Sequence, residues 1–140
     1  MILVTGGTGL AGSFVVRELQ RRGYPVRVLA RPESAVIAQG MGAEVALGDL
    51  ADADSLRRAA EGVAGIVHVA CTFTQPEVDV AAMEILLDAW EQGAFVFISS
   101  LDVYGYARRL PVTEDHPLDA TTPFRPHAAH YRRGASDVRR

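Results

Sequence analysis

The amino-terminal stretch decides the fold, and residues 2–12 read ILVTGGTGLAG. The apolar run Ile2–Thr5 predicts a short buried strand, which the following glycines bring to an end. Hydrophobic residues then recur at helical spacing from Leu10 to about Arg22, and Gly23 marks the expected end of that helix. A glycine-rich turn between a buried strand and an amphipathic helix is typical of units that bind dinucleotides.

Each glycine of the turn has a physical role in this prediction. We expect Gly6 to permit the tight turn, Gly9 to let the backbone approach a pyrophosphate, and Gly12 to let the helix pack close to the sheet. The amide groups at the start of the helix, around Leu10 and Ala11, would then face the anion.

Outward from this turn, strand and helix patterns alternate along the chain. Further strands are expected at Val26–Ala30, Ala43–Leu47, Gly65–Ala70 and Ala94–Ser99, and further helices at Pro32–Gln39, Asp52–Glu61 and Glu77–Gln92. This alternation predicts an α/β fold, a Rossmann-type doubly wound parallel sheet of about five strands with flanking helices on both faces. On the first helix, Leu10, Phe14 or Val15, and Leu19 are expected to face inward.

Two segments near the end of the chain differ from the rest. Residues 105–126 contain four of the seven prolines and predict a long surface loop. Residues 124–140 contain five arginines and two histidines with little aliphatic bulk, and predict an arginine-rich tail or a short last helix. We therefore assign residues 1–123 to a dinucleotide-binding domain and treat residues 124–140 separately.

Composition excludes several classes of function. The chain has 140 residues, of which 49% are hydrophobic and 22% are charged, as expected for one globular domain. All 14 basic residues are arginine, so chemistry that needs a lysine amine of this chain is excluded. The net charge of −3 argues against a nucleic-acid partner, and no apolar run is long enough for a membrane helix.

The cysteine count bears on compartment and on metal binding. Cys71 is the single cysteine, so no internal disulfide is possible and a cytoplasmic location is expected. Cys71 and His68 have no partner cluster at metal-ligand spacing. We predict no metal site and interpret both side chains as core residues of a buried strand.

Four motifs together resemble a known family. They are TGGTGLAG at 5–12, GDL at 48–50, VHVA at 67–70 and FISSLDVYG at 97–105, and the loop PVTEDHP at 111–117 follows them. In order and separation they are similar to the extended branch of the short-chain dehydrogenase/reductase superfamily, which contains nucleotide-sugar epimerases, dehydratases and reductases. The resemblance covers about residues 1–123. It implies hydride transfer between a nicotinamide cofactor and a hydroxyl or carbonyl group of a small-molecule substrate, such as a nucleotide sugar.

The end of the second strand bears on the choice of cofactor. Ala30 stands where NAD-binding proteins carry an acidic residue, and Arg31 follows it. An arginine there pairs with the 2′-phosphate of NADP, so NADP is favoured over NAD. The alternative is that Arg31 is a solvated loop charge, and Glu33 nearby could pair with it.

The resemblance implies roles for residues after the third and fourth strands. The side chain of Asp49 would hydrogen-bond the adenine edge, with Leu50 packing nearby, whereas the alternative for Asp49 is a turn or helix-capping aspartate. The backbone of Val69, Ala70 and Cys71 would line the nicotinamide ribose.

The family's catalytic group consists of a serine or threonine, a tyrosine, and a lysine four residues after the tyrosine. Counting back from Val-Tyr-Gly at 103–105 places the serine at Ser100, which would hydrogen-bond the reacting oxygen. In one alignment Tyr131 is the proton donor and acceptor, with Ala135 in the lysine position. In another, Phe124 takes the tyrosine position and Ala128 the lysine position. Neither alignment supplies a lysine, because the chain has none.

Two functions therefore stay open from the sequence. One is a nicotinamide-dependent oxidoreductase or epimerase with an incomplete catalytic site, and the other is a non-catalytic NADP-binding module or sensor. Members of the extended branch are about twice as long, so we expect this chain to lack the carboxy-terminal substrate lobe. Residues 124–140 could be a native continuation, a truncated end or an out-of-frame translation. An exposed strand edge and apolar face predict a homo-oligomer.

Overall fold

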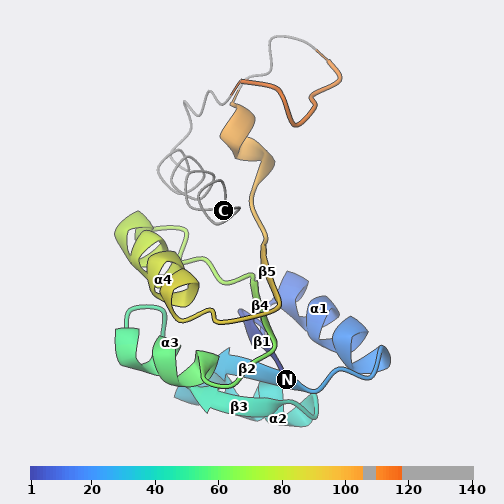
Figure 1. Ribbon diagram of the computed structural model, residues 1–140, viewed down its shortest axis with the longest axis vertical. Coiled ribbons are helices and arrows are strands. Elements are labelled where there is room, and N and C mark those ends of the chain that lie inside the picture. The colour runs from blue at the N-terminus through green and yellow to red at the C-terminus, as the bar shows by residue number, and fades with distance from the viewer. Residues whose placement is uncertain (106–109, 118–140) are drawn as a thin grey trace.

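The computed structural model describes residues 1–105 and 110–117 (Figure 1). Its strands are β1 (Ile2–Thr5), β2 (Val26–Ala30), β3 (Glu44–Leu47), β4 (Gly65–His68) and β5 (Ala94–Phe97). Its α-helices are α1 (Leu10–Arg21), α2 (Ala35–Gly40), α3 (Ala53–Ala60) and α4 (Pro76–Asp88). Two 3₁₀ turns, η1 (Pro32–Ser34) and η2 (Leu101–Tyr104), complete the described elements.

The strands form one parallel sheet in the order β3-β2-β1-β4-β5. Val4 of β1 lies at the centre, paired in register with Val28 of β2 on one side and Val67 of β4 on the other. From β1 the chain adds β2 and then β3 on one side of the sheet. It then returns to the other side of β1, where it adds β4 and β5. The order therefore reverses between β1 and β4, which is where ligands bind in open sheets of this kind.

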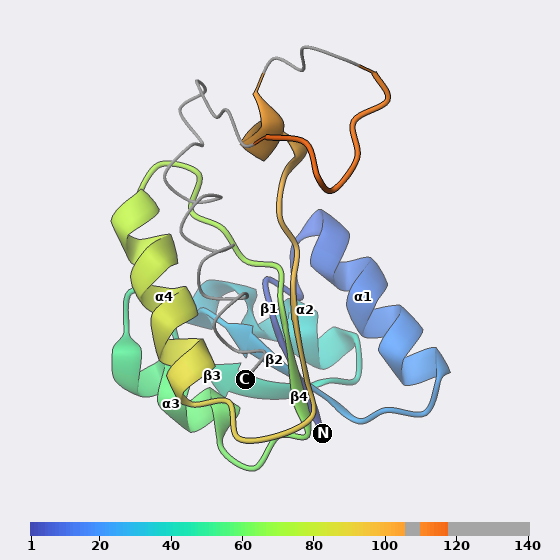
Figure 2. The same cartoon turned by 45° about the horizontal axis from the view of Figure 1, so that its top comes forward.

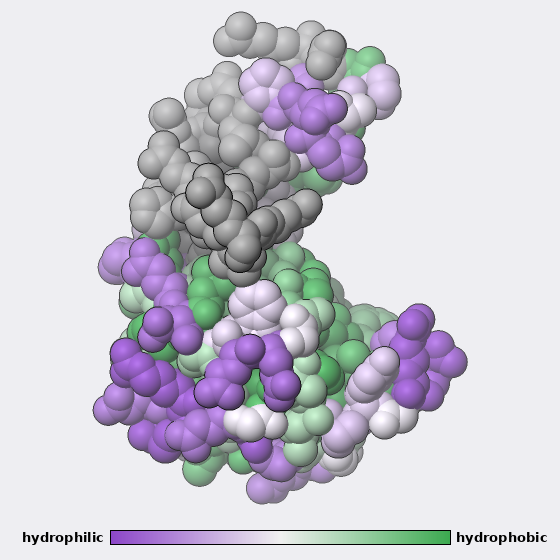
Figure 3. All heavy atoms as spheres, viewed as in Figure 1, coloured by the Kyte–Doolittle hydropathy of each residue, from purple (hydrophilic) through white to green (hydrophobic). Residues whose placement is uncertain are grey.

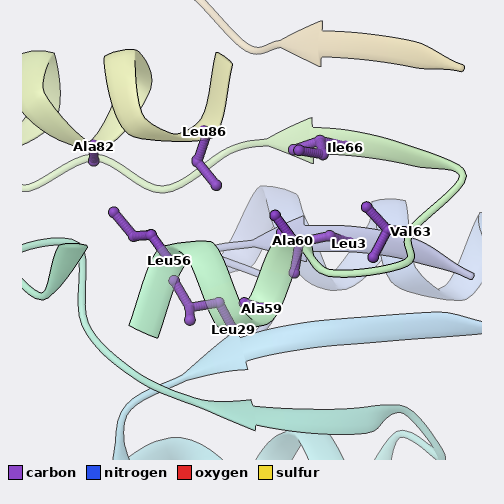
Figure 4. Packing of buried hydrophobic residues seen from close by; sticks show 9 residues of the cluster. All are labelled: Leu3, Leu29, Leu56, Ala59, Ala60, Val63, Ile66, Ala82 and Leu86. Carbon is purple, nitrogen blue, oxygen red and sulfur yellow. The ribbon is translucent and has the colours of Figure 1, made fainter. Parts of the chain in front are cut away.

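Helices cover both faces of the sheet, with α3 and α4 on one face and α1 and α2 on the other (Figure 2). The α3–α4 face buries an aliphatic cluster that includes Leu3, Leu56, Ile66 and Leu86 (Figure 4). The opposite cluster is built mainly from valines of the central strands together with Val16 of α1. The predicted Rossmann-type doubly wound sheet is confirmed.

Several element ends differ from the prediction, and the clearest case is the end of β4. The strand was expected to reach Ala70 but ends at His68. Past that end, the Thr5 hydroxyl oxygen accepts the amide hydrogens of Val69 and Ala70, both at 3.2 Å, and the Val69 amide is shared with the Thr5 carbonyl oxygen at 3.3 Å. Helix α3 begins at Ala53, because Asp52 is its N-cap residue and accepts the amides of Asp54 and Ser55.

The prediction for the inward face of α1 was partly wrong. Val16 and Gly12 are buried, and Val15 and Leu19 are half-buried, whereas Phe14 is exposed. Leu10, the first residue of the helix, is exposed as well.

Two further expectations concern the carboxy-terminal third. Residues 110–117 contain no helix or strand, as predicted for a surface loop. The predicted last helix or tail at 124–140 lies outside the described residues. Within residues 1–105 and 110–117, no helix has the length and hydrophobicity needed to span a membrane.

Candidate functional site

The loop between β1 and α1 lies at the carboxyl end of the sheet, next to the point where the strand order reverses. Gly6 has a φ of +69°, a left-handed conformation that favours glycine. The loop closes tightly, because the Gly9 amide donates to the Gly6 carbonyl oxygen at 3.0 Å. Gly6 therefore makes the tight turn that was expected of it.

Close backbone contacts leave no room for side chains at two of the glycines. A β-carbon on Gly6 would lie 2.8 Å from the amide nitrogen of Ala70, just past β4. A β-carbon on Gly12 would lie 2.0 Å from the Gly6 carbonyl oxygen. The close approach of α1 at Gly12 is thus to the loop backbone, and not to a strand as expected.

The glycine that packs against the sheet is Gly7, which sequence reasoning did not assign. It is buried, and a β-carbon there would lie 2.9 Å from the side chain of Val28. Gly9 differs from the others, since among the described residues a β-carbon there would meet only the Gly6 oxygen, at 3.3 Å. The space over Gly9 is open, which fits close approach by a ligand.

The start of α1 has the properties of an anion site. Gly9 is its N-cap residue, no side chain caps it, and its first turn carries no acidic residue. Leu10 and Ala11 are exposed there. Amide groups and the helix dipole favour negative charge at such a terminus. Together with the open space over Gly9, these residues fit the diphosphate of a dinucleotide.

The end of β2 places Arg31 beside Glu33. Ala30 is buried, whereas Arg31 is exposed, and its Nε lies 3.0 Å from Glu33 Oε1. Both side chains are more than half exposed, so the ion pair is weak and can open. The structure therefore contains the pairing that the sequence left as an alternative.

The loop after β3 is held by Ser55, another residue that sequence reasoning did not assign. The buried Ser55 hydroxyl lies 3.2 Å from both the amide nitrogen and the carbonyl oxygen of Asp49. Oδ1 of Asp49 accepts the amide of Ala51 at 2.9 Å, as a turn aspartate does. Leu50 is half-buried and packs against the α3–α4 cluster.

Thr5 joins the glycine loop to the end of β4. Its hydroxyl oxygen accepts the amides of Val69 and Ala70 and lies 2.6 Å from Nδ1 of His68. Because both lone pairs of the oxygen are used, the hydroxyl hydrogen is donated to His68. Nδ1 is therefore the acceptor, and the neutral ring carries its hydrogen on Nε2.

His68 is fully buried, as expected for a core residue. Within the described part of the chain its Nε2 has no hydrogen-bond partner, and its ring packs 5.7 Å from that of Phe97. Burial lowers the pKa of His68 to about 4, against a smaller opposing effect of the Asp79 carboxylate. The imidazole is neutral at physiological pH.

Cys71 was expected to be buried, but it is exposed, because β4 ends three residues before it. Partial desolvation raises the pKa of its thiol, and Asp79 raises it further. A thiol with a raised pKa is a poor nucleophile at neutral pH. Among the described residues no group of three or more His, Cys, Asp and Glu side chains could hold a metal ion.

Ser100 lies at the carboxyl end of the sheet, three residues past β5, and is exposed. Its carbonyl oxygen accepts the amide of Val103 at 3.4 Å as the chain enters η2. Tyr104 packs edge-to-face against the buried His116, with ring centroids 6.1 Å apart. Tyr131 and the alternative Phe124 lie outside the described residues.

A family model described as the NAD dependent epimerase/dehydratase family matches residues 2–139. The chain belongs to this family. The match covers the glycine loop, the ends of all five strands and Ser100.

Solved and curated proteins are also similar to this chain. A short-chain dehydrogenase/reductase superfamily protein from Agrobacterium tumefaciens, solved with bound NAD, is 35% identical with a TM-score of 0.79. The similarity covers 99% of this chain and 44% of that one. The UDP-glucose 4-epimerase of Bacillus subtilis is 33% identical over 88% of this chain and 43% of its own. Cinnamoyl-CoA reductase 1 of Oryza sativa subsp. japonica is 42% identical over 50% of this chain and 23% of its own.

The chain therefore spans less than half the length of these relatives. The relatives include an epimerase and a reductase, so the similarity does not select one substrate.

Proposed function

We propose that this protein binds a nicotinamide dinucleotide across the reversal point between β1 and β4, and that its site serves hydride transfer. The bound nicotinamide would supply or accept a hydride at a hydroxyl or carbonyl carbon of a small-molecule substrate, such as a nucleotide sugar. One observation carries the proposal: the glycine loop is closed by backbone contacts at Gly6 and Gly12, while the space over Gly9 and the uncapped start of α1 is open. Membership in an NAD-dependent family supports it.

The proposal assigns the residues by position. The diphosphate lies on Gly6, Gly9, Leu10, Ala11 and Gly12. The adenosine half lies over the ends of β2 and β3, and the nicotinamide half lies over the end of β4. The adenosine residues are Ala30, Arg31, Asp49 and Leu50, and the nicotinamide residues are Val69, Ala70 and Cys71. A cytoplasmic setting belongs to the proposal, because Cys71 has no second cysteine with which to form a disulfide.

The catalytic assignment is Ser100 for orienting the substrate oxygen and Tyr131 for proton transfer. Without a lysine to lower its pKa, Tyr131 would keep a high pKa, and turnover near neutral pH would be slow. This absence is also the observation that favours a second candidate, a non-catalytic NADP-binding module or sensor.

Titration with NADPH and NADH, followed by nicotinamide fluorescence, tests both candidates, because both require binding. Absence of binding by both dinucleotides would overturn the two together. A hydride-transfer assay with Ser100→Ala and Tyr131→Phe then separates enzyme from sensor. Residual activity that is the same in both variants would contradict the catalytic assignment.

We further propose that NADP is preferred over NAD through Arg31. Arg31→Ala is expected to weaken NADPH binding about tenfold, which is the value of one charged hydrogen bond, and to change NADH binding less than about twofold. Glu33→Gln should instead strengthen NADPH binding, because it releases Arg31 from its ion pair. The measurement is the dissociation constant of each dinucleotide by fluorescence titration.

The matched control is Arg22→Ala. Arg22 is exposed and paired with Glu18, but it follows the opposite end of α1. Equal losses of NADPH and NADH affinity in Arg31→Ala would contradict the proposed preference.

We also propose that the protein is a homo-oligomer that uses the edge strand β5. Beside β5 an apolar groove of about 700 Å³ is lined by Phe14, Leu19, Ile66 and Val96, among others. On the face drawn in Figure 3, hydrophobic residues gather over the strands between α4 and α1, and hydrophilic residues cover the outer parts of the helices. A strand edge next to exposed apolar surface favours pairing with another chain.

Light scattering should therefore show a dimer or larger species. Val96→Glu is expected to shift it toward monomer, raising the dissociation constant by at least about tenfold, because a charge would be buried at the contact. Val36→Glu, on the exposed surface of α2, is the matched control and should leave the mass unchanged. A monomeric unaltered chain would overturn this proposal.

A further inference from the structure

The loop between β4 and α4, residues 71–75, lies at the carboxyl edge of the sheet beside the reversal point. Ala70, just before this 71–75 loop, touches the glycine loop so closely that a β-carbon on Gly6 would lie 2.8 Å from its amide nitrogen. The 71–75 loop therefore continues directly from the backbone that borders the diphosphate site.

Asp79 of α4 holds this loop from the other side. Its side chain is almost fully buried, at 1% exposure. Oδ1 accepts the amide of Thr72 at 2.9 Å, and Oδ2 accepts the Thr72 hydroxyl at 2.8 Å and the Cys71 thiol at 3.6 Å. Burial of a carboxylate is costly unless donors surround it, and here the donors come from the 71–75 loop.

The conformation that Asp79 holds is a strained one. Phe73 has a φ of +63°, in the left-handed region that aromatic residues rarely adopt, and its amide donates to Cys71 Sγ at 3.4 Å. The Thr72 hydroxyl oxygen also accepts the amide of Gln75 at 3.1 Å. Strained backbone persists only where its surroundings determine it, and it concentrates at ligand sites.

We infer that Asp79 is a positioning residue for the nicotinamide half of the dinucleotide, an inference that rests on the proposed function. A dinucleotide that straddles the reversal point places its adenosine half over β2 and β3. Its other half must then lie over the end of β4, where the 71–75 loop begins. Asp79 and Thr72 hold this loop in its strained conformation beside that half.

The test compares a whole dinucleotide with ADP, which occupies only the adenosine half and the diphosphate site. Asp79→Leu removes every acceptor of the carboxylate. This variant is expected to lower the affinity for the reduced dinucleotide at least about tenfold, because affinity falls with the fraction of molecules whose loop is in the binding-competent conformation. ADP affinity should stay within about twofold. Glu84→Leu, at an exposed acid on the same helix, is the matched control and should change neither constant.

A second pair of variants keeps the test decisive if Asp79→Leu fails to fold. Thr72→Val removes the hydroxyl without changing the shape of the side chain. It should lower the affinity for the dinucleotide but not the affinity for ADP. Thr72→Ser restores the hydroxyl and should restore affinity. Thermal unfolding identifies the folded variants.

The outcomes separate this inference from the proposed function. If the unaltered chain binds neither the dinucleotides nor ADP, the proposed function fails. If it binds them and folded variants at 72 and 79 bind equally well, only the role of Asp79 is wrong. Equal loss of dinucleotide and ADP affinity would also overturn the positioning role, because it would show a general effect on the site.

Discussion

Gly12→Ala should be among the most damaging single substitutions in this chain. The added methyl would lie 2.0 Å from the Gly6 carbonyl oxygen and 2.6 Å from its carbonyl carbon. Both atoms are backbone, so no side chain can rotate away, and α1 must move from the loop. We expect a loss of about 3 kcal/mol in the free energy of unfolding, measured by urea denaturation. Dinucleotide affinity should fall at least about a hundredfold, because the start of α1 no longer faces the diphosphate site.

Two other glycines provide controls for this prediction. Gly40→Ala places a methyl in open space at the end of α2 and should leave stability within about 1 kcal/mol. Gly9→Ala adds a methyl that meets only one atom of residues 1–105 and 110–117 within 4 Å, so the fold should persist while dinucleotide binding weakens about tenfold. If Gly12→Ala is as stable as Gly40→Ala, the described loop geometry is wrong. If Gly9→Ala binds the dinucleotide normally, the diphosphate does not lie over Gly9.

The second large effect is a loss of stability in acid that originates at His68. Burial lowers its pKa from 6.5 in the unfolded chain to about 4 in the folded protein. Between these values the unfolded chain binds more protons than the folded one, so stability falls as the pH falls. The shift corresponds to a contribution of about 3 kcal/mol to the free energy of unfolding. This contribution is present above about pH 6.5 and is lost by about pH 4. Protonation of Nδ1 also removes the acceptor for the Thr5 hydroxyl, which joins β1 to the end of β4.

Urea denaturation across this pH range, on the unaltered chain and on His68→Asn, measures the effect. The asparagine oxygen can accept from Thr5 but does not titrate, so the pH dependence between about 6.5 and 4 should flatten. Glu18→Gln is the control: arginine hydrogen bonds lower the pKa of Glu18 from 4.5 to about 2, so its contribution to stability is lost mainly between those two pH values, below most of the His68 range. An unchanged slope in His68→Asn would show that another group causes the loss.

Much of the fold could be predicted because the signals for it are local. The apolar run of β1, the glycines that follow and the stop at Gly23 lie within a few residues of one another. The prediction for α1 erred at Phe14 because helical periodicity identifies an apolar stripe but not its centre. That centre lies at Gly12 and Val16, which are buried, and at Gly12 the helix comes closest to the backbone of the glycine loop.

The candidate site could be predicted only in part. Its glycines and Ser100 follow from motif spacing, and their roles in binding and catalysis remain proposals. The Thr5 contacts with His68 and Ala70 join residues 63 and 65 positions apart, and no local pattern indicates them. The hydrogen bonds between Asp79 and Thr72 join residues only seven positions apart. They could not be predicted, because they depend on how α4 packs against the end of β4.

The sequence by itself determined the order of strands and helices, the closing of the glycine loop and the absence of any lysine, because these depend on neighbouring residues or on composition alone. Only the tertiary structure decided which polar side chains share the carboxyl edge of the sheet. Parallel pairing brings the ends of β1 and β4 together, so Thr5 meets the backbone after His68 and Gly6 meets Ala70. Packing of α4 then buries Asp79 against the 71–75 loop, which precedes this helix. A carboxylate that no motif identified is therefore the group that accepts the amide and hydroxyl of Thr72.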